Sequence, residues 1–334
     1  MIYLKKNRIK IEMPDVHKNA KMSINLQRTL RLPDDGTVYS LPPGLGKFPL
    51  RHIEDYDLGR NQALKKRGGL IMPMFQADAL WISFDTPSVS GHTEYPFAVK
   101  IATGKICAIS GDSWNSQLMR DPQNYVVTPD QPWLDGYNVA RGRVKQFVAA
   151  PLGQGYTAEE QITGSGEVGG IQIQIIPMKK EAYKTLNEPL DLISFCKSGF
   201  ETNASCDFDM GLAPGGEMRQ EIYDDPHDFS VWDLRKAERF FITIANAEQW
   251  MEITGEEPPL AHFTTQDYTM AGLPWFDYYS QDKVAIDGAE RLGELKSVKQ
   301  IKPKKGDNFW VSDPNVGEPK VVTLGKKVIS AGSW

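Results

Sequence analysis

The chain has 334 residues, of which 40% are hydrophobic and 24% are charged, so it can bury a sizeable core without disulfides or metal ions. Its 38 basic and 43 acidic residues give a net charge of −5, which argues against nucleic acid or an anionic membrane as the main partner. Three cysteines, Cys107, Cys196 and Cys206, cannot form a closed disulfide set and indicate a reducing compartment. Neither a signal-peptide pattern nor 18 consecutive apolar residues occurs, so we expect a soluble, cytoplasmic protein.

The order of the chain predicts three parts. Residues 1–23 are expected to be a flexible N-terminal leader, because their basic residues are sparse and interrupted by acidic ones. A strand-rich half then covers 24–180, and an α+β half covers 181–334. Whether the two halves share one core or form separate units is left open by the sequence.

Short apolar runs bounded by turn residues predict many strands. They fall at 24–32, 79–84, 97–101, 105–109, 125–127, 134–140, 144–149, 171–175 and 239–245. Short loops containing Gly104 and Gly142 predict hairpins at 97–109 and 134–149. The segment 321–329 suggests a further, closing hairpin.

Alternation is strictest at 171–175, where isoleucine and glutamine take turns. Ile171, Ile173 and Ile175 are expected to face the core, with Gln172 and Gln174 on the opposite face. The segment 41–49 contains three prolines and two glycines, which excludes a helix or a central strand and predicts an ordered loop or an edge segment.

Helix signals are short. Thr157 with Glu160 forms a capping box that Gly164 ends, and Asn246 with Gln249 does the same for a helix that Gly255 ends. Further short helices are expected within 51–67, 264–271 and 287–300. Because short strands recur at intervals of about ten residues, the sequence predicts an α+β, predominantly β fold. Its core is expected to be an antiparallel β-sandwich or barrel-like, with short helices inserted in loops.

One candidate metal site stands out. Asp224, Asp225, His227 and Asp228 place four oxygen- or nitrogen-bearing side chains within five residues, with Asp207 and Asp209 upstream. Such a cluster could hold a hard divalent cation. An acidic surface turn is the competing interpretation, because Asp-Pro pairs favour turns. The spacings typical of zinc sites are missing from the five histidines.

A candidate binding site lies in the aromatic segment that follows Gly272. Pro274 stiffens the chain there, and Trp275, Asp277, Tyr278 and Tyr279 are expected to border any site the protein has. Aromatic loops form carbohydrate platforms or protein-binding surfaces, or close the end of a β core.

Signals for catalysis and for cofactors are weak. Cys196 precedes a lysine that could lower its pKa, but a structural thiol is the simpler interpretation. The glycine-rich run 164–170 precedes a strand instead of opening a helix, so it lacks the mechanism of a dinucleotide loop. No motif indicates a cofactor.

Three segments, 41–50, 151–161 and 271–279, together resemble a family of uncharacterised bacterial proteins without an assigned function. The resemblance covers most of 24–300 and implies a bacterial, cytosolic protein, but it carries no ligand or catalytic residue.

Two functions remain open. The first is a non-catalytic binding or scaffold protein with a protein or small-molecule partner. The second is an enzyme with a site assembled from distant residues, such as a metal-assisted hydrolase that uses the acidic region 207–228.

Overall fold

The computed structural model describes residues 1–57, 62–187, 210–258, 265–278, 280, 282–301, 314–317 and 319–324. The strands are β1 Ile2–Lys5, β2 Arg8–Glu12, β3 Lys21–Thr29, β4 Val38–Tyr39, β5 Gly44–Lys47, β6 Arg51–His52, β7 Leu70–Pro73, β8 Ala79–Asp85, β9 Phe97–Thr103, β10 Ile106–Cys107, β11 Val126–Thr128, β12 Trp133–Leu134, β13 Gly136–Ala140, β14 Arg143–Pro151, β15 Ile171–Pro177, β16 Met210–Arg219, β17 Glu238–Ala245, β18 Pro274–Tyr278 and β19 Lys320–Leu324. The helices are α1 Gln62–Arg67, α2 Ala158–Thr163, α3 Lys180–Leu186, α4 Ala247–Thr254, α5 Thr265–Met270 and α6 Glu290–Gly293, with 3-10 turns at Ile53–Asp55, Phe229–Val231 and Leu234–Lys236.

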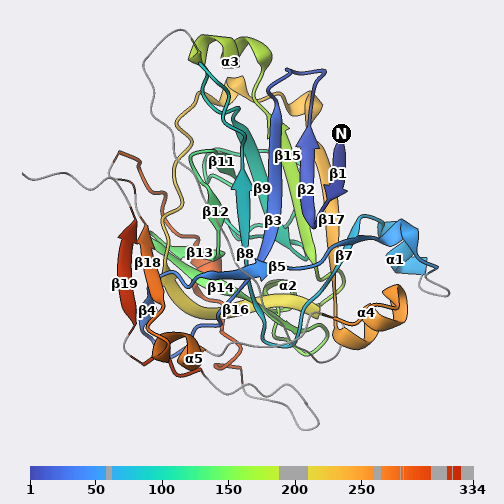
Figure 1. The fold of residues 1–334 in the computed structure, drawn as a ribbon, viewed down its shortest axis with the longest axis vertical. Helices are drawn as coiled ribbons and strands as arrows, with labels where there is room; N and C mark the ends of the chain where they lie inside the picture. The colour runs from blue at the N-terminus through green and yellow to red at the C-terminus, as the bar shows by residue number, and fades with distance from the viewer. Residues whose placement is uncertain are drawn as a thin grey trace, which may run out of the picture.

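Strands β1 to β17 belong to one extended, mostly antiparallel sheet (Figure 1). One run of neighbours is β1–β2–β3–β8, and another is β11–β9–β15–β17. The long strands β14 and β16 connect the two runs, because β8 pairs with β14, β14 with β16 and β16 with β17. In Figure 1, β16 crosses below the upright strands of both runs.

The main core is filled from both runs. Ile24 of β3, Ile82 of β8, Val99 of β9, Ile173 of β15 and Ile242 of β17 belong to one apolar cluster and are all fully buried. Since this cluster draws on both sequence halves, 24–180 and 181–334 share a core. The expected fold class, α+β and predominantly antiparallel β with short helices, is confirmed.

The expected flexible leader is wrong. Residues 2–12 form β1 and β2, which pair with each other, and β2 continues the sheet by pairing with β3. Ile9 and Ile11 are fully buried and alternate with charged neighbours. This is the pattern of a strand with one face in the core. The basic residues are the solvent-side half of that pattern, and they do not mark a tail.

Strand β15 has the predicted faces. Ile171, Ile173 and Ile175 are fully buried in the main core, whereas Gln172 and Gln174 lie on the other face. That second face is also covered, since Gln174 is 6% exposed and its Nε2 donates to the Ser116 carbonyl at 3.2 Å. The glutamines therefore face away from the main core but not into open water.

Most local signals are confirmed. Both predicted hairpins form, as β9–β10 and β13–β14, and both capping boxes are present, at α2 and α4. The helix expected across 287–300 is limited to the single turn of α6. Of the expected closing hairpin, 320–324 forms β19, which pairs in parallel with β18; 325–334 lie outside the described residues, so the hairpin itself stays a prediction.

Strand β16 is the main element without a sequence prediction. It contains Pro214, Gly215 and Gly216, which normally break strands. The sheet requires at least one of these glycines, because a Cβ atom at Gly216 would lie 2.2 Å from the carbonyl oxygen of Pro33. Here glycine permits the close approach of two backbones.

Candidate functional site

Two unusual segments of the sequence meet at one end of the sheet. The Leu41 amide donates to the Phe276 carbonyl at 2.7 Å, and the Phe276 amide returns a bond to the Leu41 carbonyl at 2.9 Å. This bridge joins the start of the proline-rich segment 41–49 to β18. Both lie beside the start of β12, because Leu41 and Tyr278 line one recess with Trp133, and the Tyr278 ring packs on the Trp133 ring.

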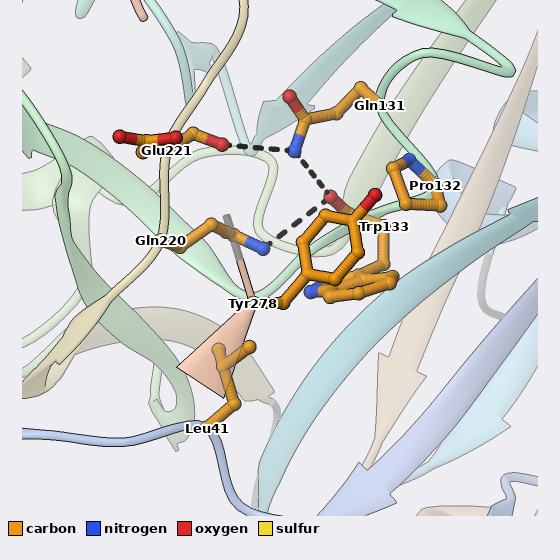
Figure 2. Close-up of a pocket in the computed structure, with 7 residues that line it drawn as sticks. All are labelled: Leu41, Gln131, Pro132, Trp133, Gln220, Glu221 and Tyr278. Atoms are coloured by element: carbon orange, nitrogen blue, oxygen red, sulfur yellow. Dashed lines mark hydrogen bonds between the residues drawn. The ribbon is translucent and has the colours of Figure 1, made fainter. Parts of the chain in front are cut away.

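A shallow recess opens where these segments converge (Figure 2). It holds about 200 Å³ of empty space, including its open mouth, and its lining residues are Leu41, Gln131, Pro132, Trp133, Gln220, Glu221 and Tyr278. Most of that space is open to solvent, and the enclosed part has room for about one water molecule. A larger ligand would therefore pack over the recess and its lining without being enclosed by it.

A row of three aromatic side chains begins at the recess, where Tyr278 and Trp133 line it, and continues to Trp81 outside the lining. The rings of Trp133 and Tyr278 are 4.9 Å apart, and Trp133 meets Trp81 edge-to-face at 6.2 Å. All three side chains are half-buried. The far end of the row is covered by Gly44, where a Cβ atom would lie 3.1 Å from the Trp81 ring.

The two amide side chains in the wall are used internally. Gln131 donates through Nε2 to the carbonyls of Trp133 and Glu221, and its Oε1 accepts from the Tyr223 amide. Gln220 donates to the same Trp133 carbonyl and to Asp135, as Figure 2 shows in part. These amides fix the wall and have little hydrogen-bonding capacity left for a ligand.

A buried carboxyl group lies directly behind this wall. Asp135 is 3% exposed, and its Oδ2 accepts from Gln220 Nε2 at 2.6 Å. Burial raises the pKa of Asp135 to about 7, although hydrogen bonds from Gln220 and Trp133 oppose that shift. The group therefore changes charge near neutral pH, next to two side chains that line the recess.

An ion pair lies next to the recess, at the residue before Gln131. Asp130 pairs with Lys283 at 2.7 Å, and the Lys283 ammonium lies 5.2 Å from the ring centre of Tyr223. Burial, and secondarily the Asp130 carboxylate, raises the pKa of Tyr278. Glu221 Oε2 is buried and accepts no hydrogen bond from the described residues, but in Figure 2 its carboxylate points away from the two rings.

The structure places Trp275, Asp277 and Tyr278, which were predicted to border one binding site, in three different surroundings. Tyr278 lines the recess, whereas Trp275 is fully buried and packs with Tyr268 in the core. Asp277 pairs with Arg219 at 3.2 Å, outside the lining. Tyr279 lies outside the described residues.

The side chains of the acidic segment 224–228 do not converge on one point, and two of them accept hydrogen bonds from neighbouring parts of the chain. Asp225 is buried, and its Oδ2 accepts from the Tyr125 hydroxyl at 2.6 Å and from the Trp232 indole at 2.8 Å. Asp228 accepts from the Ser230 amide and begins a 3-10 turn.

The other two candidate metal ligands, Asp224 and His227, lie in separate surroundings. Asp224 is exposed and lies 4.0 Å from Arg120, and the His227 ring packs edge-to-face on Trp232. Burial lowers the pKa of His227, which favours its neutral form. Among the described residues, no three His, Cys, Asp or Glu side chains are grouped to hold a metal ion. Asp207 and Asp209 are not described, so metal binding here stays a prediction.

Two glutamines also hold the backbone next to this segment. Gln131 bonds to the Glu221 carbonyl and the Tyr223 amide, and Gln123 bonds to the Tyr223 carbonyl and the Asp225 amide, all at 2.9 to 3.2 Å. On its other side, Tyr223 bridges to Ala285. The chain from 221 to 225 is thus bonded like a strand, with side-chain amides in place of one neighbour.

The glycine-rich run 164–170 binds a side chain of the same protein. The amides of Val168 and Gly169 donate to Glu159 Oε2 at 3.3 and 2.9 Å. Glu159 is 2% exposed, and burial raises its pKa. The run therefore binds a carboxylate of its own chain. Of the cysteines, Cys107 is buried, and Cys196 and Cys206 lie outside the described residues.

Sequence reasoning missed most of the recess. Leu41, Gln131, Trp133 and Gln220 line the recess but were not identified as site residues. Trp133 next to Pro132 is a local signal that could have pointed here, because a proline presents its neighbour rigidly. The pairing of 41 with 276 is long-range and has no local signal.

Comparisons with protein-family models, curated proteins and solved structures find no match to this chain. Across the part of the chain that the structure describes, no helix is both long enough and apolar enough to cross a membrane.

Proposed function

We propose that this chain is a cytoplasmic, non-catalytic binding or scaffold protein whose contact point is the recess beside Trp133 and Tyr278. The observation that carries the proposal is the half-buried aromatic row at a place where distant segments converge. Binding energy in protein sites concentrates at such rigid aromatic side chains. Tyr278 and Trp133 are fixed against each other, so little conformational entropy is lost when a ligand packs on them.

The lining predicts the polarity of the bound group. Leu41, Pro132 and the two rings are apolar, and the amides of Gln131 and Gln220 are already bonded. A ligand with several polar groups would lose its water without gaining replacement bonds from these two amides, which is costly. The recess therefore favours an apolar group that packs over its lining.

Nuclear magnetic resonance can test this proposal with defined probes. We expect cyclopentanol, a single-ring probe, to shift the indole N–H signal of Trp133, which Trp133→Phe assigns among the eight tryptophans. Tyr278→Ala should weaken the response. The control Leu234→Ala removes a side chain that is 50% exposed, lies in the 3-10 turn Leu234–Lys236 and does not line the recess, and it should change nothing. If the Trp133 signal does not move at saturating probe, the proposed function is wrong.

A further inference from the structure

Three segments of the chain meet around the buried Tyr183 of α3, at the end of the molecule away from β18 and β19 (Figure 1). The His17 ring packs edge-to-face on the Tyr183 ring at 5.0 Å. The Tyr183 hydroxyl donates to the Thr93 carbonyl at 2.7 Å, and the Thr93 amide donates to Asn187 Oδ1 at 2.6 Å. These contacts fix the loops that carry His17 and Thr93 against α3.

Basic side chains from all three segments gather here. Lys180 and Lys184 are exposed and lie one turn apart on α3, where like charges repel and destabilise a helix. Lys18 and His92 are exposed on the two loops. Burial lowers the pKa of His17, and all four of these basic neighbours lower it further. We call the five side chains the cationic cluster: His17, Lys18, His92, Lys180 and Lys184.

The neighbouring carboxylates do not neutralise the cationic cluster. Asp15 forms an ion pair with Lys236, and Glu94 accepts hydrogen bonds from two hydroxyl groups. Glu181 directly follows Lys180 on α3, so the two side chains do not face each other. Within the part of the chain that the structure describes, the three lysines of the cluster form no ion pair. Their charges are therefore available to an anion from solution.

His17 adds a fixed hydrogen-bond donor to these charges. Its Nδ1 accepts from the Asn19 amide at 3.1 Å, so the proton of the neutral ring is on Nε2. That Nε2 makes no hydrogen bond with the described residues. The ring itself is held in place, because it stacks on Tyr95 at 5.7 Å in addition to its contact with Tyr183.

We propose that the cationic cluster binds a phosphoryl group, which carries close to two negative charges near neutral pH. A lysine ammonium binds phosphate as a point charge, and several lysines match one dianion better than they match a single carboxylate. A bound dianion would also offset the repulsion between Lys180 and Lys184. The cluster is separate from the recess, so this inference does not depend on the proposed function.

Nuclear magnetic resonance of the histidine rings tests the proposal on the full chain. His17→Gln assigns the His17 signal among the five histidines. Inorganic phosphate is titrated near neutral pH in parallel with acetate, at one ionic strength, because added salt alone would screen the cluster. We expect phosphate to shift the His17 signal saturably and to raise the pKa of His17, and we expect acetate to do neither.

Two double variants with the same change in net charge locate the site. Lys180→Gln with Lys184→Gln should weaken phosphate binding by roughly tenfold or more. Without phosphate it should also raise the pKa of His17, because two of the four basic neighbours lose their charge. The control, Lys65→Gln with Lys66→Gln, changes two exposed lysines of α1 and should alter neither result. If the two double variants behave alike, or if acetate acts as phosphate does, the proposal is overturned.

A third arm identifies the source of the phosphoryl group. Acetyl-Ala-phosphoserine-Ala-amide is compared with inorganic phosphate and with the unphosphorylated peptide. Tighter binding of the phosphopeptide than of inorganic phosphate assigns the cluster to a phosphorylated segment of a protein, and equal or weaker binding assigns it to free phosphate. If neither phosphate nor the phosphopeptide shifts the His17 signal, the proposal is overturned, and the proposed function at the recess is unaffected.

Discussion

Asp135 should make the stability of this protein depend on pH in an unusual direction. In the folded chain its pKa is about 7, against an ordinary value of 3.8, because the carboxyl group is buried. Between these two values the folded state binds the proton more tightly than the unfolded state does. The free energy of unfolding should therefore fall as pH rises through this window, and the loss is complete above about pH 7.

The size of the effect follows from the shift. Each pKa unit corresponds to about 1.4 kcal/mol, so a shift of about three units sets an upper limit of about 4 kcal/mol. Between pH 5 and pH 8 the parent protein should lose about 2–3 kcal/mol through this one group. Asp135→Asn should not show that loss, because an amide does not titrate. It keeps an oxygen to accept the bond from Gln220.

Urea unfolding followed by circular dichroism at pH 5, 6, 7 and 8, at one ionic strength, measures both proteins. Asp228→Asn is a matched control, because its exposed carboxyl has a lowered pKa and stays ionised throughout this range. Equal slopes of unfolding free energy against pH for the parent and Asp135→Asn would refute the reasoning. They would show that the two hydrogen bonds to Asp135 offset its burial.

Three further perturbations test the packing. Ile173→Asp should abolish folding, as measured by circular dichroism, because it places a carboxylate in the main core. Gln172→Lys should be tolerated, because Gln172 is half-buried on the opposite face of the strand. Equal sensitivity to the two substitutions would mean that both faces are equally packed. Trp275→Ala should cost about 3–5 kcal/mol in chemical denaturation, as expected for a fully buried ring, and a smaller loss would remove it from the core. Lys100→Met should lower the free energy of unfolding by about 1–3 kcal/mol and speed hydrogen exchange at 115–117. The reason is that the buried Lys100 ammonium donates to three oxygens of Asn115 and Gln117. A more stable variant would show that burying the charge costs more than these hydrogen bonds contribute.

The local elements of this fold were predictable because their signals are local. The isoleucine alternation at 171–175 and the capping box of Thr157 with Glu160 each describe neighbours along the chain. Strand β16 was not predictable, because Pro214 and Gly216 are tolerated only through contacts with distant segments. The same limit applies to the recess. Tyr278 could be proposed from its aromatic surroundings, but its partner Trp133 is brought to it by the sheet.

The two glutamines that bond residues 221–225 also affect how copies of this protein behave toward one another. A strand edge with free amides and carbonyls can recruit a strand from another molecule, which is a route to aggregation. Gln123 and Gln131 occupy that edge with side chains, and a side-chain amide ends the ladder because no further backbone follows it. Replacing either glutamine by leucine would leave backbone amides and carbonyls of 221–225 without these bonds. We therefore expect such variants to aggregate at high concentration or on long storage while the chain still folds.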